Sequence, residues 1–142
     1  MTFVREEERY VSAASVFEEF THRVGAREPE AAAALFSEAP DFFIPGPENI
    51  PFNGRRRNRE EIAQFFRDLW ENLLDSDIEI SDLIVSEPHI VAIGRVTHTA
   101  AGTGRRFPNE FAWHLVIVDD QIQALQVYDD TNAVVQAFET AK

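Results

Sequence analysis

The sequence predicts an α+β fold in which helices cover one face of an antiparallel β-sheet. Up to Ser76 the apolar residues recur at three- and four-residue steps, as on amphipathic helices, and beyond it they alternate with polar residues, as on strands. The turns between the expected strands are too short for a parallel crossover, which needs about a dozen residues. A strongly twisted sheet wrapped around the helices would leave a cone-shaped cavity.

Two helices are expected near the start of the chain. The first covers 5–24, where Glu6, Glu7 and Glu8 suit the positive end of the helix dipole and Gly25 supplies a stop. Its apolar face comprises Tyr10, Ala13, Ala14, Phe17, Phe20 and Val24. A shorter helix follows Pro29 and runs over 30–36, because proline favours the first turn of a helix.

A short strand at 41–44 comes next and ends at Pro45, after which a loop runs to Gly54. The third helix begins after Asn58, an N-cap, with Glu61 placed as in a capping box. Its unusually aromatic face comprises Ile62, Phe65, Phe66, Leu69, Trp70 and Leu73.

The second half of the chain predicts four strands and a terminal helix. The strands are expected at 78–87, 90–99, 106–118 and 122–130, and the helix at 132–140. Turn-forming residues separate the strands, including Glu87-Pro88 and Asp119-Asp120. Asp130 or Thr131 would cap the final helix.

Composition limits the protein class. With 142 residues, 44% hydrophobic and 27% charged, the chain is expected to form one domain over 1–142. No apolar run approaches the roughly 18 residues of a membrane span, and the start of the chain turns acidic where a signal peptide would turn apolar. The absence of cysteine excludes disulfides and thiolate chemistry, and we expect a cytoplasmic protein.

The formal net charge of −12 disfavours nucleic acid and anionic membranes as partners. Arg55, Arg56, Arg57 and Arg59 form the one local exception. They would bind an anion beside a helix start or, as we favour, pair with acidic side chains in a solvated loop. Helical metal-ligand spacings, phosphate loops and dinucleotide fingerprints are missing from the sequence, so we predict no metal and no cofactor.

The order and spacing of these segments resemble the SnoaL-like family of the nuclear transport factor 2-like (ketosteroid isomerase-like) superfamily over nearly the whole chain. The resemblance is carried by 42–47, Gly54, 58–62, Phe65-Phe66, 97–99, 103–107, 119–122, Tyr128, Asp130 and Thr131.

That resemblance implies a conical half-barrel, also called cystatin-like, in which a twisted antiparallel sheet wraps around three helices and encloses a deep apolar pocket. It also implies a homodimer formed through the outer sheet face and chemistry without metal or cofactor. Polyketide cyclases, steroid isomerases, epoxide hydrolases, dehydratases and non-catalytic binders share this fold, so fold alone does not decide function.

Asp130 is the expected catalytic residue. It occupies the family's aspartate position, eight residues after Ile122, and Tyr128 would share its strand face as orienting group or hydrogen-bond donor. Burial in an apolar cavity would raise the carboxyl pKa and suit it to general acid/base chemistry. Alternatively, Asp130 caps the terminal helix or pairs with an arginine, and the neighbouring Asp129 leaves the register open.

The sequence departs from each catalytic template of the family. Trp113 stands where cyclases often carry a histidine, and His114 would face the opposite side of the sheet. His98, in a Thr-His-Thr segment similar to that of the cyclases, would replace the missing histidine or be an ordinary hydrogen-bonded strand residue.

Two other templates of the superfamily also lack essential groups. The steroid-isomerase tyrosine and aspartate positions fall on Phe20 and near Ile44. For the Asp-Arg-Asp relay of the epoxide hydrolases, Arg95 and Asp130 would supply two of the three groups, unless Arg95 forms a salt bridge on the sheet face.

Two functions therefore stand. One is acid/base chemistry, such as cyclisation, isomerisation or dehydration, on a flat hydrophobic small molecule. The other is binding of such a molecule without turnover, favoured by the missing histidine and tyrosine. In both, the expected pocket wall comprises Trp113, Phe20, Phe66, Phe42, His98 and Phe111.

Overall fold

The computed structural model describes residues 12–138. Its helices are α2 (Ala13–Gly25), α3 (Pro29–Ala33), α4 (Arg59–Asn72) and α5 (Thr131–Phe138). Its strands are β1 (Phe36–Ile44), β2 (Gly54–Arg56), β3 (Leu73–Ser86), β4 (His89–Ala100), β5 (Arg106–Val118) and β6 (Gln121–Asp129).

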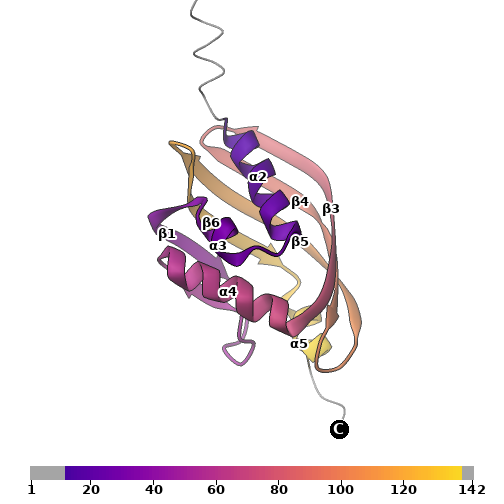
Figure 1. Ribbon diagram of the computed structural model, residues 1–142. Coiled ribbons are helices and arrows are strands. Elements are labelled where there is room, and N and C mark those ends of the chain that lie inside the picture. The colour runs from indigo at the N-terminus through magenta and orange to yellow at the C-terminus, as the bar shows by residue number, and fades with distance from the viewer. Residues whose placement is uncertain (1–11, 139–142) are drawn as a thin grey trace, which may run out of the picture.

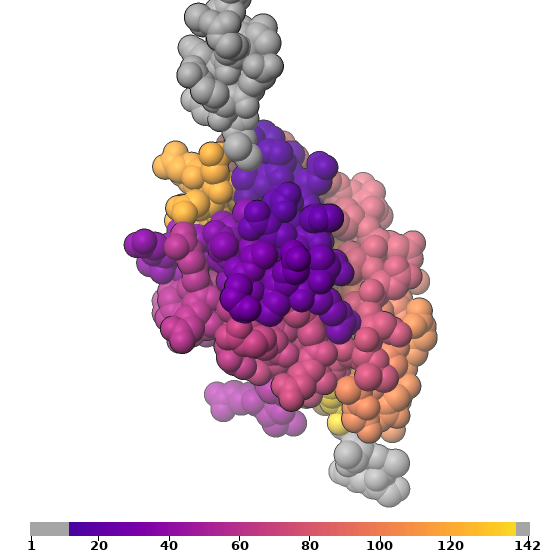
Figure 2. Space-filling view, viewed as in Figure 1, coloured from indigo at the N-terminus to yellow at the C-terminus, as the bar shows by residue number. Residues whose placement is uncertain are grey.

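The strands form one curled sheet in the order β2-β1-β6-β5-β4-β3. Every neighbouring pair is antiparallel except β1 and β6, which run parallel. Helices α2, α3 and α4 lie over one face of the sheet (Figure 1). Figure 2 shows α2 and α4 covering that face, while β3 is visible at its right-hand edge. The predicted α+β fold with helices over a twisted sheet is confirmed.

Two early elements differ from the prediction. The second helix ends at Ala33 rather than at 36, and β1 begins at Phe36 rather than at 41. Phe36 is fully buried and stacks on Phe42, with ring centroids 5.6 Å apart, so packing of the strand outweighs local helix propensity. The loop expected up to Gly54 also leads into a short strand, β2, which pairs with β1.

The third helix begins as predicted. The Asn58 side chain accepts a hydrogen bond from the Glu61 N–H at 2.8 Å, and the Glu61 carboxylate accepts one from the Arg57 N–H at 2.8 Å. After α4 the chain enters β3 directly, so that strand begins at Leu73 and not at 78. The first helix does not run without a break from residue 5, because Ser12 is extended and caps a helix that begins at Ala13, its side chain accepting a hydrogen bond from the Ser15 N–H at 3.1 Å. Residues 5–11 of that expected helix and 139–140 of the last lie outside the described residues.

Arginines of the segment 55–59 bond to other groups of the same chain. Arg55 pairs with Asp41, the buried Arg56 donates to the Phe52 carbonyl at 2.7 Å, and Arg59 donates to the Phe36 carbonyl at 2.8 Å. The expected pairing with acidic side chains is therefore found for Arg55, whereas Arg56 and Arg59 bond to backbone carbonyls, and Arg56 lies buried in β2 rather than in a solvated loop. Within residues 12–138, no helix combines the length and the apolar character that a bilayer span requires.

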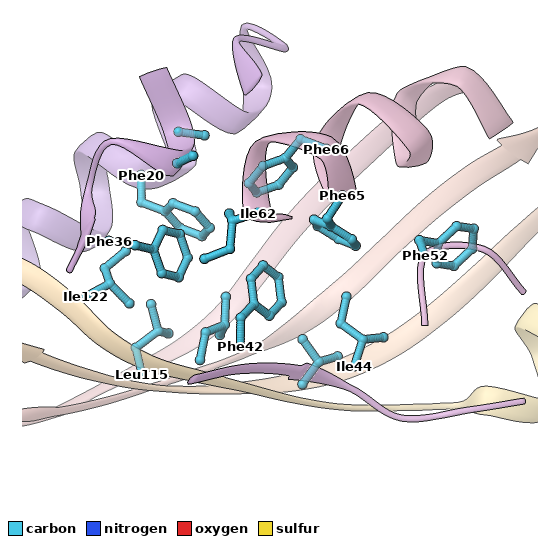
Figure 3. Close-up of a cluster of buried hydrophobic side chains, with 14 of the residues drawn as sticks. Phe20, Phe36, Phe42, Ile44, Phe52, Ile62, Phe65, Phe66, Leu115 and Ile122 are labelled. Carbon is cyan, nitrogen blue, oxygen red and sulfur yellow. The ribbon is translucent and has the colours of Figure 1, made fainter. Parts of the chain in front are cut away.

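Buried aromatic rings fill the space between the helices and β1 (Figure 3). Phe42 lies at the centre of this cluster, with its ring centroid 4.9 Å from that of Phe65 and 6.4 Å from that of Phe66. Phe20 packs edge-on against Phe36 at 5.7 Å. Four of these rings, Phe20, Phe42, Phe65 and Phe66, also form part of the wall of a cavity against the sheet.

Candidate functional site

A cavity of about 170 Å³ lies between α2, α4 and the concave face of β3, β4, β5 and β6. Its wall is mostly apolar, and both tryptophans of the chain, Trp70 and Trp113, take part in it. All six side chains predicted for the pocket wall line this cavity: Phe20, Phe42, Phe66, His98, Phe111 and Trp113. Their part in binding a substrate stays a prediction.

Regular alternation along β5 places one set of side chains in the cavity. Phe107, Asn109, Phe111 and Trp113 line it, as the spacing along this strand predicts for Trp113. The rings of Phe111 and Trp113 stack with centroids 4.0 Å apart. The expected outward direction of His114 is also confirmed, because its ring nitrogen lies 2.9 Å from that of His89 and neither residue lines the cavity.

The predicted placement of Asp130 and Tyr128 in the pocket is wrong. Tyr128 is 57% exposed, and Asp130 is exposed with its carboxylate accepting a hydrogen bond from the Ala133 N–H at 3.1 Å. Asp130 therefore caps α5, the alternative that the sequence had left open. The cavity receives the side chain of Asp129 instead.

A β-bulge explains this one-residue error. Ile117 pairs with Ile122 and Val116 pairs with Ala124, so Gln123 is an extra residue in β6. Counting by twos from the buried Ile122 leads to Tyr128 and Asp130, but the extra residue reverses the faces. Beyond the bulge the inward side chains of β6 are Leu125, Val127 and Asp129.

The Asp129 carboxylate has one bonded and one unbonded oxygen. Its Oδ2 accepts a hydrogen bond from Asn109 Nδ2 at 3.0 Å, and Asn109 Oδ1 accepts one from the Asp130 N–H at 3.0 Å. Asn109 is only 5% exposed, so this contact has a fixed place in the wall. Oδ1 of Asp129 is buried without a hydrogen-bond partner among the described residues.

Burial raises the pKa of Asp129 above its ordinary value of 3.8. The hydrogen bond from Asn109 acts in the opposite direction, and the charge of Asp130 adds to the increase. A partly desolvated carboxylate is a stronger base than one in water, and its conjugate acid persists to higher pH. Asp129 thus has the environment that had been expected for Asp130.

A second polar group lies on the other side of the cavity. Ser76 Oγ is 2.6 Å from His98 Nδ1, and Arg27 lines the wall next to them, donating to the Leu73 carbonyl at 3.1 Å. Burial and the positive charge of Arg27 lower the pKa of His98 to about 4, against an opposing effect of Asp75. His98 is therefore neutral near pH 7.

The alternative family templates are not assembled. Phe20 and Ile44 line the cavity without a polar group, so the steroid-isomerase pair is missing. Arg95 is exposed and does not line the cavity, so it cannot join Asp129 in an epoxide-hydrolase relay. Among residues 12–138, three or more His, Asp or Glu side chains nowhere gather closely enough to hold a metal ion.

Sequence reasoning missed Asn109, Ser76 and Arg27, and it raised Asp129 only as the neighbour that left the register of Asp130 open. Asn109 could have been found, because it is the polar member of the alternating series formed by Phe107, Phe111 and Trp113. The bulge at Gln123 hid Asp129. Ser76 reaches the cavity because β3 begins earlier than predicted, and Arg27 reaches it because the backbone turns after α2. Neither feature had a clear signal in the sequence.

The sequence matches the SnoaL-like domain family over residues 17–125, more than half of the chain. No curated protein shows significant sequence similarity to it.

Solved structures have similar folds at low sequence identity. A nuclear transport factor 2-like protein from Burkholderia thailandensis E264 has a TM-score of 0.81 and 20% identity, covering 92% of this chain and 100% of its own. TerC, co-crystallised with polyporic acid, has a TM-score of 0.79 and 14% identity, with coverages of 90% and 98%. A protein of ketosteroid isomerase-like fold from Catenulispora acidiphila DSM 44928, in complex with trimethylamine, has a TM-score of 0.75 and 14% identity, with coverages of 89% and 97%.

Proposed function

The chain belongs to the SnoaL-like domain family, and from that premise we propose that it performs cofactor-independent acid/base chemistry on a hydrophobic small molecule, with Asp129 as the proton-transferring group. One observation carries the proposal: Asp129 lines the cavity, and its Oδ1 is buried with no hydrogen-bond partner within residues 12–138. A buried polar atom left without a partner is costly, and a ligand that offers it a proton would remove that cost.

The proposed reaction begins at a C–H bond beside a substrate carbonyl. Oδ1 of the ionised Asp129 takes the proton, the C–H electron pair forms a carbon–carbon double bond, and the carbonyl electrons move to oxygen to give an enolate. With a β,γ-unsaturated carbonyl compound the enolate is conjugated, and return of the proton from Asp129 to its far carbon completes an isomerisation. In a cyclisation the enolate carbon attacks a second carbonyl of the same molecule, and the alkoxide formed there takes the proton back from Asp129. Asn109 holds Oδ2, which leaves Oδ1 as the oxygen available to take the proton.

The apolar wall supports this chemistry in two ways. It excludes water, which keeps Asp129 a strong base and protects the enolate from bulk proton exchange. Stacked rings such as Phe111 and Trp113 also favour a flat ligand. The substrate class proposed is therefore a flat, largely apolar carbonyl compound.

Proton exchange on 1-tetralone, a flat bicyclic ketone, tests the proposal. In D2O we expect the protein to accelerate loss of the ¹H NMR signal of the protons beside the carbonyl. Because Asp129 must be ionised to act as a base, the rate should rise with pH through its raised pKa and then level off. A profile that levels off below the ordinary carboxyl pKa would contradict this assignment.

Binding without turnover is the competing function, and Trp113 in place of the family's histidine supports it. Saturation-transfer NMR on the same samples separates the two, because it detects bound 1-tetralone whether or not exchange occurs. Bound ketone whose protons exchange no faster than in buffer would favour a binder and refute the acid/base proposal.

We also propose that two copies associate through the outer sheet face. Ile93 and Tyr128 both pair with Ala112 on that face, and they are 38% and 57% exposed. Contiguous apolar exposure of this kind is typical of an interaction surface. Sedimentation velocity should give about twice the 16.2 kDa chain mass, and Ile93→Glu should shift it to the monomer. A wild-type protein that sediments at 16.2 kDa would contradict the dimer.

A further inference from the structure

A positive charge lies at one end of the cavity. Arg27 follows α2 with a left-handed φ of 55°, and its guanidinium donates to the Leu73 carbonyl at 3.1 Å. That bond uses only one of the five N–H donors of a guanidinium. None of the ion pairs found among residues 12–138 involves Arg27.

The neighbours of Arg27 in the cavity are neutral hydrogen-bonding groups. Ser76 Oγ and His98 Nδ1 are 2.6 Å apart, and the His98 ring packs against Phe107 with centroids 5.5 Å apart. The nearby Asp75 carboxylate accepts from Thr99 Oγ1 at 2.8 Å and also lies 3.7 Å from Arg106. Asp75 does not line the cavity, so this end presents net positive charge to a ligand.

Asp129 lies at the end of the cavity away from Arg27 and His98. His98 on β4 pairs with Phe107 on β5, whereas Asp129 on β6 pairs with Phe111, four residues further along β5. Two strand spacings and four residues separate the backbones of His98 and Asp129 by roughly 15 Å. Apolar side chains, including Val96, Phe107 and Phe111, line the wall between them.

We infer that the ligand is an elongated apolar carboxylate whose anionic group binds Arg27, with Ser76 and His98 as additional hydrogen-bonding groups, while its carbon skeleton extends towards Asp129. Arginine matches a carboxylate with two parallel N–H bonds. The inference rests on the proposed function, because it identifies the substrate class of the same cavity. It also gives the ligand one orientation, since the only acidic side chain lining the cavity in the described part of the chain, Asp129, would repel a carboxylate.

Two probes with the same ring system and similar size test this inference by isothermal titration calorimetry at pH 7. They are 2-naphthoate, which is anionic, and 2-naphthalenemethanol, which is neutral. In the wild type we expect naphthoate to bind about tenfold more tightly. Arg27→Gln should remove this preference and leave the affinity for the neutral probe unchanged, which also verifies its fold. Arg57→Gln, an exposed residue outside the cavity, changes the net charge equally and should keep the preference.

Arg27→Lys keeps the charge without the planar fork and should retain part of the preference. Equal wild-type affinities for the two probes would overturn the inference, as would a preference that survives Arg27→Gln or disappears equally in Arg57→Gln. Failure to bind either probe would overturn it as well. Proton exchange on 1-tetralone is measured separately, and this ketone has no carboxylate. The acid/base proposal can therefore fail while the preference for the anionic probe holds, and the preference can fail while the acid/base proposal holds.

Discussion

Asp129→Asn is expected to reduce protein-catalysed exchange of 1-tetralone protons by about 100-fold or more. An amide oxygen is too weak a base to take a proton from carbon, so the chemical step is lost. The side chain keeps nearly the same size, and its oxygen can still accept the hydrogen bond from Asn109. Affinity for the ketone, measured by saturation-transfer NMR, should therefore change little.

Asp130→Asn is the matched control, because the two residues are neighbours and the charge change is identical. Asp130 caps α5 outside the cavity, and asparagine is an equally good capping residue. Its exchange rate should equal that of the wild type. If Asp130→Asn abolished exchange and Asp129→Asn did not, the original assignment from family spacing would be correct and the placement in the cavity would be irrelevant to catalysis.

Asp129→Asn also has a predictable effect on the free energy of unfolding. Because burial raises the pKa of Asp129, the folded protein holds this proton more tightly than the unfolded chain does. The contribution of this proton to the free energy of unfolding is fully present below the ordinary pKa of 3.8. It is lost as the pH rises through the raised pKa of the folded protein. At pH 7 the ionised carboxylate is therefore a cost that asparagine removes. Urea unfolding should show Asp129→Asn at least as stable as wild type at pH 7, with any advantage shrinking as the solution is acidified.

The sequence was informative where local pattern and tertiary structure agree. Trp113 was placed correctly because β5 alternates without interruption through this position. Asp129 was missed because the bulge at Gln123 depends on pairing with a strand that the local pattern of β6 does not reveal. Arg27 was missed because a left-handed residue after a helix aims its side chain in a direction that helical spacing cannot predict.

Phe36→Ala is expected to lower the free energy of unfolding by about 3–5 kcal/mol, as measured by urea denaturation. The side chain is fully buried, stacks on Phe42 and meets Phe20 edge-on. Alanine would leave a hole where rings from α2 and from β1 hold one another in place. Phe43→Ala is the matched control on the same strand, because Phe43 is only partly buried and its ring contacts Arg55 at 4.6 Å. Its loss should be about 1 kcal/mol.

The stability and the ligand affinity of Phe36→Ala, taken together, also test whether Phe36 supports the wall of the cavity. Phe36 does not line the cavity, but both of its ring partners, Phe20 and Phe42, do. If those rings stay in place, Phe36→Ala is strongly destabilised and still binds 2-naphthoate with wild-type affinity under conditions where it is folded. If they collapse into the hole, the loss of stability falls below about 2 kcal/mol, because relaxation reduces the cost of a cavity, and the binding wall is displaced so that affinity falls. Small destabilisation together with unchanged affinity would contradict both outcomes and would mean that Phe36 is not packed as described.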